Sequence, residues 1–97
     1  MSDNRAVPTV QLENEHLRVT EWCFAPGAAT GWHSHGFPYF VTMLTKGVLR
    51  IHDGKDVSDV SLAAGQAYSR PAGVTHDVMN VSDHPIAFIE KIGRAHV

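Results

Sequence analysis

Three histidines in two short stretches of the sequence could together hold a metal ion. His33 and His35 are separated by one residue, within the run Gly-Trp-His-Ser-His-Gly. On a β-strand, alternate side chains share a face and lie about 6.6 Å apart at Cα, so both imidazoles could reach one ion. A pair so spaced is a weak signal by itself, because two surface histidines on a strand are commoner. A third ligand must come from another part of the fold.

The third candidate is His76, which follows residues that form turns. It lies three residues after Gly73, which is itself two residues after Pro71. Pro71 and Gly73 suit a tight turn that brings the strand carrying His76 across from the first pair. We expect Asn80, near the end of that strand, to bind backbone groups rather than metal.

These two stretches resemble the two short signatures of the cupin family. The first, G-x5-H-x-H-x3,4-E-x6-G, is matched by Gly27, His33, His35 and Gly47 but has no Glu. The second, G-x5-P-x-G-x2-H-x3-N, is matched at every fixed position, from Gly65 onward. Its Gly-Pro-Gly skeleton alone would occur by chance at about 10⁻⁴ of positions.

The resemblance extends over about residues 7–92 and implies a fold and a ligand set. It implies one cupin domain, residues 1–97, folded as an all-β double-stranded β-helix, a jelly-roll barrel. It also implies that His33, His35 and His76 are the metal ligands. The glutamate ligand of the first signature is missing: counting back from Gly47 places it at Phe40. Three neutral imidazoles leave the full +2 charge on the ion, which favours an anionic or oxygen-chelating ligand.

The choice of metal stays open at this point. Imidazole ligands suit Zn, Fe, Cu and Ni, and a structural zinc site would normally have four protein ligands. Three-histidine cupins include dioxygenases, and this resemblance implies a divalent ion with Fe(II) as first choice and Zn as second, while Ni, Cu and Mn remain possible. A cupin that has lost its metal is the alternative.

Three other residues are candidates for the catalytic pocket: Tyr39, Tyr68 and Arg70. Tyr68 and Arg70 share one face of a predicted strand, so Arg70 could hold a substrate carboxylate while Tyr68 donates a hydrogen bond. A surface arginine lying over an aromatic ring is an equally good interpretation. If Phe40 faces inward, Tyr39 lies beside the mouth of the metal site.

The remaining notable side chains are expected to be structural. Trp32, Phe37 and Phe40 are interpreted as walls and core, and Cys23 as a small core residue. Glu90 shares a face with Phe88 and Ile92, so a partly buried acid is expected, either in the pocket or in a salt bridge at a strand end. The other four histidines are expected to be solvated: His16, His52, His84 and His96.

Short strands must position these residues. Glycine and proline interrupt the chain at short intervals, and the segments between them are rich in Val, Ile, Thr and aromatic residues. Strands are predicted at 17–25, 39–45, 48–52, 57–62, 67–70, 76–81 and 86–92. So many short strands indicate an all-β sandwich or barrel. Residues 7–12 resemble a strand with no partner close in sequence, which predicts a homodimer formed partly through them; a frayed terminus is the alternative.

Length and composition limit the classes of protein. The 97 residues suffice for one domain, and the net charge of -2 argues against nucleic-acid binding. No apolar run is long enough to cross a membrane, and the first ten residues do not resemble a signal peptide. The single cysteine fits a reducing cytoplasm. We therefore expect a cytoplasmic protein that binds a small-molecule substrate, with no nucleic acid and no membrane as partner.

The resemblance also suggests a function. It implies a non-haem Fe(II) dioxygenase-type oxidoreductase that acts on a small anionic metabolite. Two alternatives remain open: a binding or sensory cupin without turnover, and an isomerase or hydrolase that uses Zn as a Lewis acid. Residues 20–36 are also loosely similar to small cupins associated with β-alanine degradation.

Overall fold

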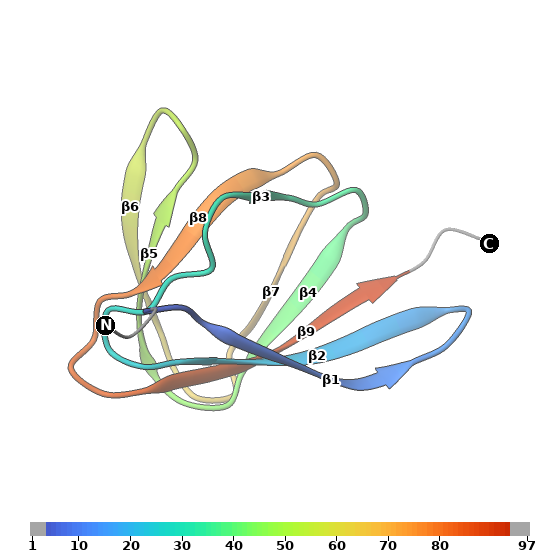
Figure 1. Ribbon diagram of the computed structural model, residues 1–97, viewed down its shortest axis with the longest axis horizontal. Coiled ribbons are helices and arrows are strands. Elements are labelled where there is room, and N and C mark those ends of the chain that lie inside the picture. The colour runs from blue at the N-terminus through green and yellow to red at the C-terminus, as the bar shows by residue number, and fades with distance from the viewer. Residues whose placement is uncertain (1–3, 94–97) are drawn as a thin grey trace.

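The computed structural model describes residues 4–93, which form nine strands and no helix (Figure 1). One sheet has the order β1-β2-β9-β4-β7: β1 (Val7–Glu13), β2 (Leu17–Phe24), β9 (Ile86–Gly93), β4 (Tyr39–Met43) and β7 (Ala67–Arg70). The other has the order β3-β8-β5-β6: β3 (His33–Ser34), β8 (Thr75–Asn80), β5 (Gly47–His52) and β6 (Val57–Leu62). The described residues thus contain no helix long and apolar enough to cross a membrane.

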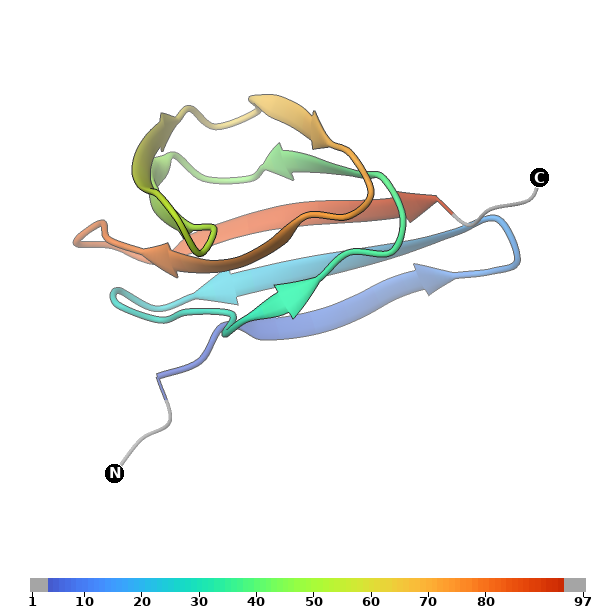
Figure 2. The same cartoon turned by 90° about the horizontal axis from the view of Figure 1, so that it is seen from above.

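The chain alternates between the two sheets, as a double-stranded β-helix requires. It passes from β2 in the first sheet to β3 in the second, back to β4, and then to β5 and β6. The strands β7, β8 and β9 repeat the alternation, and all the strand pairings are antiparallel. Figure 2 shows the strands from β4 to β9 curving around a common interior. The predicted all-β fold is confirmed, with strand boundaries close to those expected.

The interior is filled by side chains from alternate strand positions. The largest fully buried side chains are Phe24, Met43, Leu49, Ile86, Val41 and Asn80. The one amide among them is satisfied by backbone: the Asn80 Nδ2 group donates to the carbonyls of Phe24 (3.2 Å) and His84 (2.9 Å). Its Oδ1 atom accepts from the Ser82 N–H at 2.8 Å. The prediction that Asn80 binds backbone is confirmed.

Two signature glycines have clear structural reasons. Gly73 has φ of +93°, a left-handed conformation that a side chain disfavours, in the turn before β8. Gly47 begins β5 where a Cβ atom would overlap the side chain of Ile86. The first glycine allows the turn, and the second allows β5 to approach β9 closely.

Two sequence-based expectations about the first strands are wrong. Residues 7–12 have a partner close in sequence, because β1 pairs with β2 as an antiparallel hairpin. Cys23 is exposed rather than in the core. It lies between the half-buried Trp22 and the buried Phe24, so the alternation of β2 turns it to the outer face.

Candidate metal centre

The strands β3 and β8 place two of the three histidines opposite each other. His33 and His76 are directly paired residues of this short antiparallel ladder. His35 follows β3, and its backbone is fixed by two hydrogen bonds to the turn before β8: its N–H donates to Val74 O (2.9 Å), and its carbonyl accepts from Gly73 N (2.8 Å). The turn of the second signature thus holds the histidine pair of the first.

The three imidazoles converge on one point. His33, His35 and His76 each offer a ring nitrogen, and these nitrogens all lie within 4.8 Å of one another. The Nε2 atoms of His33 and His76 are 3.1 Å apart. His35 and His76 are buried and His33 is half-buried, so the cluster lies between interior and solvent.

The backbone of Gly31 orients His33. The Gly31 carbonyl accepts a hydrogen bond from Nδ1 of His33 at 2.8 Å, which requires the proton to be on Nδ1 and leaves Nε2 with its lone pair. The Gly31 N–H in turn donates to Oδ1 of Asp77 at 3.0 Å. Such outer hydrogen bonds are typical of histidines that bind metal, because they fix the tautomer and the ring direction.

The environment keeps the other two imidazoles neutral. Burial lowers the pKa of His35 to about 4, with a further contribution from the charge of His33. Burial likewise lowers the pKa of His76 to about 4, assisted by the charges of His33, His35 and Arg70. Neutral imidazole is the form that binds a metal ion. At neutral pH these two imidazoles therefore carry no extra proton that would have to leave before a metal ion binds.

These residues fit a divalent metal ion. Two nitrogens bound to one ion at about 2.1 Å lie about 3.0–3.4 Å apart, which agrees with the 3.1 Å between His33 and His76. Nε2 of His35 is buried and has no hydrogen-bond partner among the described residues. A buried polar atom of this kind needs a partner, and a shared ion would provide it. The donor set of three nitrogens does not select one transition metal.

The side chain that faces the cluster from β4 is Tyr39, so the condition of an inward Phe40 is not met. Tyr39 is 3% exposed, whereas Phe40 is 56% exposed. The Tyr39 ring stacks on His35 with the ring centroids 3.9 Å apart. Tyr39 therefore takes the inward place that had been considered for Phe40, and it supports the imidazole through its ring face.

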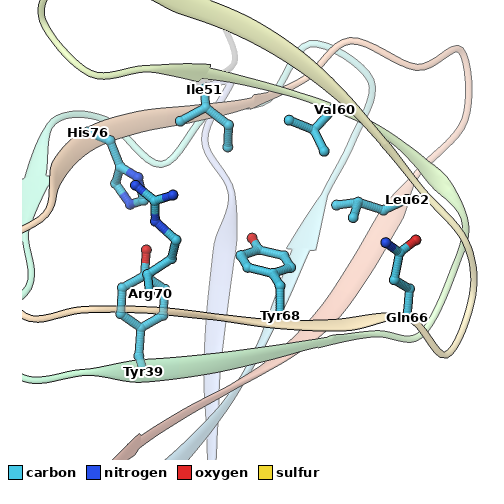
Figure 3. Close-up of a pocket in the computed structure, with 8 residues that line it drawn as sticks. All are labelled: Tyr39, Ile51, Val60, Leu62, Gln66, Tyr68, Arg70 and His76. Atoms are coloured by element: carbon cyan, nitrogen blue, oxygen red, sulfur yellow. The ribbon is translucent and has the colours of Figure 1, made fainter.

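A pocket opens beside His76, between the two sheets (Figure 3). It has a volume of about 260 Å³ and is lined by Tyr39, Ile51, Val60, Leu62, Gln66, Tyr68, Arg70 and His76. All three predicted pocket residues, Tyr39, Tyr68 and Arg70, are among them. The other lining residues were not expected from the sequence, although alternation along 57–62 places Val60 and Leu62 on one face: Ile51, Val60, Leu62 and Gln66.

Both tyrosines in this pocket can donate hydrogen bonds at neutral pH. Burial raises the pKa of Tyr68 to about 12, opposed by the charge of Arg70. Burial also raises the pKa of Tyr39 to about 12, while the charge and hydrogen bond of Arg70 oppose the rise. The guanidinium of Arg70 extends toward His76 and the hydroxyl of Tyr39 (Figure 3). Arg70 lines the pocket and its side chain is exposed, which agrees with both interpretations, a substrate clamp and a surface arginine.

Two more hollows adjoin the histidines. His33 and His35 line an open one of about 270 Å³ with Arg18, Trp22, Thr30, Ser34, Gly36, Phe37 and Ile92. A cavity of about 20 Å³ lies deeper and is lined in part by His33, His76 and Glu90. Glu90 is 8% exposed and accepts a hydrogen bond from Trp22 Nε1 at 3.2 Å. The expected burial of Glu90 is confirmed. Its carboxylate is hydrogen-bonded to a tryptophan rather than paired in a salt bridge.

The remaining aromatic residues and histidines have ordinary roles. Trp32 and Phe37 are 54% and 43% exposed and lie outside the core, although Phe37 forms part of the wall of the hollow beside His33 and His35, as expected. His16 and His52 are exposed, as predicted. His84 is half-buried and hydrogen-bonds the Lys46 carbonyl at 2.8 Å. His96 lies outside the described residues.

Known proteins resemble this chain in sequence and in fold. The family described as "Cupin domain" matches residues 20–90. The chain is 51% identical over 86 residues to beta-alanine degradation protein BauB of Pseudomonas aeruginosa, covering 89% of this chain and 90% of that protein. A cupin domain from Bordetella pertussis superposes with a TM-score of 0.92 at 42% identity, covering 98% of this chain and 99% of the other. A double-stranded β-helix protein from Klebsiella pneumoniae superposes with a TM-score of 0.77 at 24% identity, covering 96% of this chain and 80% of the other. This similarity supports the fold.

Proposed function

The chain belongs to the cupin family, and from that premise we propose that it is a metal-dependent enzyme of the dioxygenase type acting on a small anionic metabolite. The observation that carries the proposal is the convergence of His33, His35 and His76 beside a pocket that contains Arg70. Three protein ligands leave coordination positions for a substrate, unlike a closed structural site.

We propose Fe(II) as the ion, with Zn as second choice. The support is the donor set of three neutral imidazoles, together with the resemblance to three-histidine cupin dioxygenases. When bound, such an ion would supply Lewis acidity and the capacity to react with O₂. The protein supplies the geometry: Gly31 orients His33, Tyr39 supports His35, and the β3–β8 ladder aligns His33 with His76.

The pocket residues would bind and orient the substrate. The guanidinium of Arg70 suits a carboxylate, which it can hold through two parallel hydrogen bonds. The protonated hydroxyls of Tyr39 and Tyr68 can donate to a second substrate oxygen. The pocket volume of about 260 Å³ lies below the range of about 300–1,000 Å³ typical of drug-sized ligands, which favours a small metabolite.

The named relative suggests a place in metabolism. Beta-alanine degradation protein BauB is 51% identical to this chain. We propose that this protein also takes part in the breakdown of a small amino acid in the cytoplasm. The lone cysteine, Cys23, is a free thiol and is compatible with a reducing compartment.

Oxygen consumption tests the proposal. Protein loaded with Fe(II) without air is mixed with oxygenated buffer and panels of small hydroxy acids, diketones and thiols, and O₂ uptake is recorded. We expect uptake that depends on one substrate class and is lost in His76→Ala and in Zn-loaded protein. Absence of uptake with every panel would contradict a dioxygenase. Product formed with Zn and no uptake would indicate an isomerase or hydrolase, and ligand retained unchanged would indicate a binding module.

We also propose a homodimer formed through β1. β1 stands at the end of its sheet, so in the described part of the chain one of its edges has no neighbouring strand. All seven β1 residues are exposed, and three are large and apolar: Val7, Val10 and Leu12, 58%, 53% and 51% exposed. An edge strand of this kind can pair with its copy across a two-fold axis.

A further inference from the structure

The two larger hollows around the histidines offer positive charge and no negative charge to a ligand. The pocket beside His76 contains the guanidinium of Arg70, and the hollow beside His33 and His35 contains that of Arg18. Among the described residues that line these hollows there is no aspartate or glutamate. A substrate carboxylate therefore has a counter-charge on either side of the cluster, whereas an ammonium group has none.

The nearby carboxylate of Glu90 does not change this balance. Glu90 lines the deeper cavity, whose volume of about 20 Å³ has room for about one water molecule. Its Oε1 atom already accepts a hydrogen bond from the Trp22 indole. Glu90 is not among the residues that line the larger pocket, where Arg70 would hold the substrate carboxylate.

The shape of the pocket beside His76 determines where the rest of the substrate lies. Arg70 and His76 are at one end, and Val60 and Leu62 are at the other (Figure 3). A small acid held by Arg70 would extend its chain toward these two apolar side chains. An amino group at the far end of that chain would meet no carboxylate among the lining residues: the polar group at that end is the amide of Gln66, whose Oε1 atom already accepts a hydrogen bond from Ala63 N–H at 2.9 Å.

We infer that the substrate is a small carboxylic acid without an amino group. This inference rests on the function proposed above, and it narrows the class of substrate. An acid of this class arises from an amino acid when the amino group is removed. In the amino-acid breakdown proposed above, a deaminating or transaminating reaction would supply this substrate, and the protein would act after that reaction rather than on the amino acid itself.

Two acids of equal length test the inference. Butyrate and β-alanine differ only in a terminal methyl or ammonium group, and their binding to Zn-loaded protein can be compared by isothermal titration calorimetry. We expect butyrate to bind at least about tenfold more tightly. Equal or tighter binding of β-alanine would overturn the inference but leave the proposed carboxylate site intact. Binding of neither acid would remove both the inference and the proposed function.

Variants of the pocket make the test sharper. Val60→Asp adds a negative charge at the apolar end and should bring the affinities for the two acids closer together or reverse their order. Arg70→Gln should weaken both acids by about tenfold. Arg50→Gln is the matched control, because Arg50 lies outside the pocket and pairs with Asp59 at 2.8 Å. If Val60→Asp melts like the wild type but keeps the full preference for butyrate, the inference is wrong.

Discussion

His33 and His76 face each other across the β3–β8 ladder, with their Nε2 atoms 3.1 Å apart. They come from the two different cupin signatures, 43 positions apart in the chain. The candidate metal centre therefore depends on one strand pairing rather than on a single loop. Changes that disturb this pairing should reduce metal binding even where they leave all three ligands in place.

Removal of one imidazole should abolish stoichiometric metal binding. His76→Ala leaves two ligands, and we expect the metal content of protein purified without chelators to fall at least about tenfold. Elemental analysis by mass spectrometry measures this directly. His52→Ala, an exposed histidine on β5, is the control and should retain its metal. Equal metal content in His76→Ala and the wild type would refute the assignment.

The turn before β8 should couple stability to metal binding. Gly73→Ala places a side chain at φ of +93° and strains the turn whose N–H donates to His35. We expect a loss of about 1–2 kcal/mol in the free energy of unfolding and weaker metal binding. Gly36→Ala is the matched control, because a Cβ atom there meets nothing within 4 Å. Chemical denaturation and metal titration of both variants would decide the matter, and identical behaviour would contradict the coupling.

The three histidines of the candidate metal centre could be picked out from the sequence because turn chemistry and spacing constrain them locally. The Pro71 and Gly73 turn has few conformations, and it leads directly into the strand that carries His76. The strand that pairs with β8 was harder to predict from sequence, because a two-residue strand such as β3 has no periodicity to detect. The family resemblance provided that pairing.

The orientation of β4 could not be predicted from its own residues. Tyr39 and Phe40 are both aromatic, so alternation allows either to face inward. The orientation follows from long-range pairing, in which Tyr39 lies opposite both Ile92 of β9 and Arg70 of β7. By contrast, the exposure of Cys23 follows from alternation within β2, because Trp22 and Phe24 on either side of it share the opposite face. The hydrogen bond from Trp22 to Glu90 joins residues 68 positions apart, which no local pattern indicates.

Glu90 should make stability depend on pH. Burial raises its pKa above the ordinary value of 4.5, while the Trp22 hydrogen bond and the charges of His33 and Arg18 oppose the rise. Folding therefore favours the protonated carboxyl. The stability that protonated Glu90 contributes is fully present below about pH 4.5. It is lost as the pH rises through the higher pKa that Glu90 has in the folded state.

Glu90→Gln tests this dependence, because the amide keeps an acceptor for Trp22 and cannot ionise. In metal-free protein we expect the variant to melt a few degrees above the wild type at neutral pH. The difference should shrink as the pH falls toward 4.5. Glu15→Gln, an exposed carboxylate in the β1–β2 turn, should change the melting temperature little at either pH. A Glu90→Gln variant that melts below the wild type at neutral pH would contradict the argument.

The open edge of β1 should control assembly. Val10→Lys with Leu12→Lys places two charges on the exposed edge strand, and lysines on such edges prevent pairing with another chain. We expect the mass in solution to change from a dimer to the 10.6 kDa monomer, as measured by light scattering after gel filtration. Val57→Lys is the control, since Val57 is similarly exposed, at 55%, on β6 in the other sheet. If the wild type is a monomer, or if the β1 variant remains a dimer with an unchanged melting temperature, then β1 is not the interface. Because the metal ligands lie on β3, β8 and the loop after β3, the monomeric variant should still bind one ion per chain.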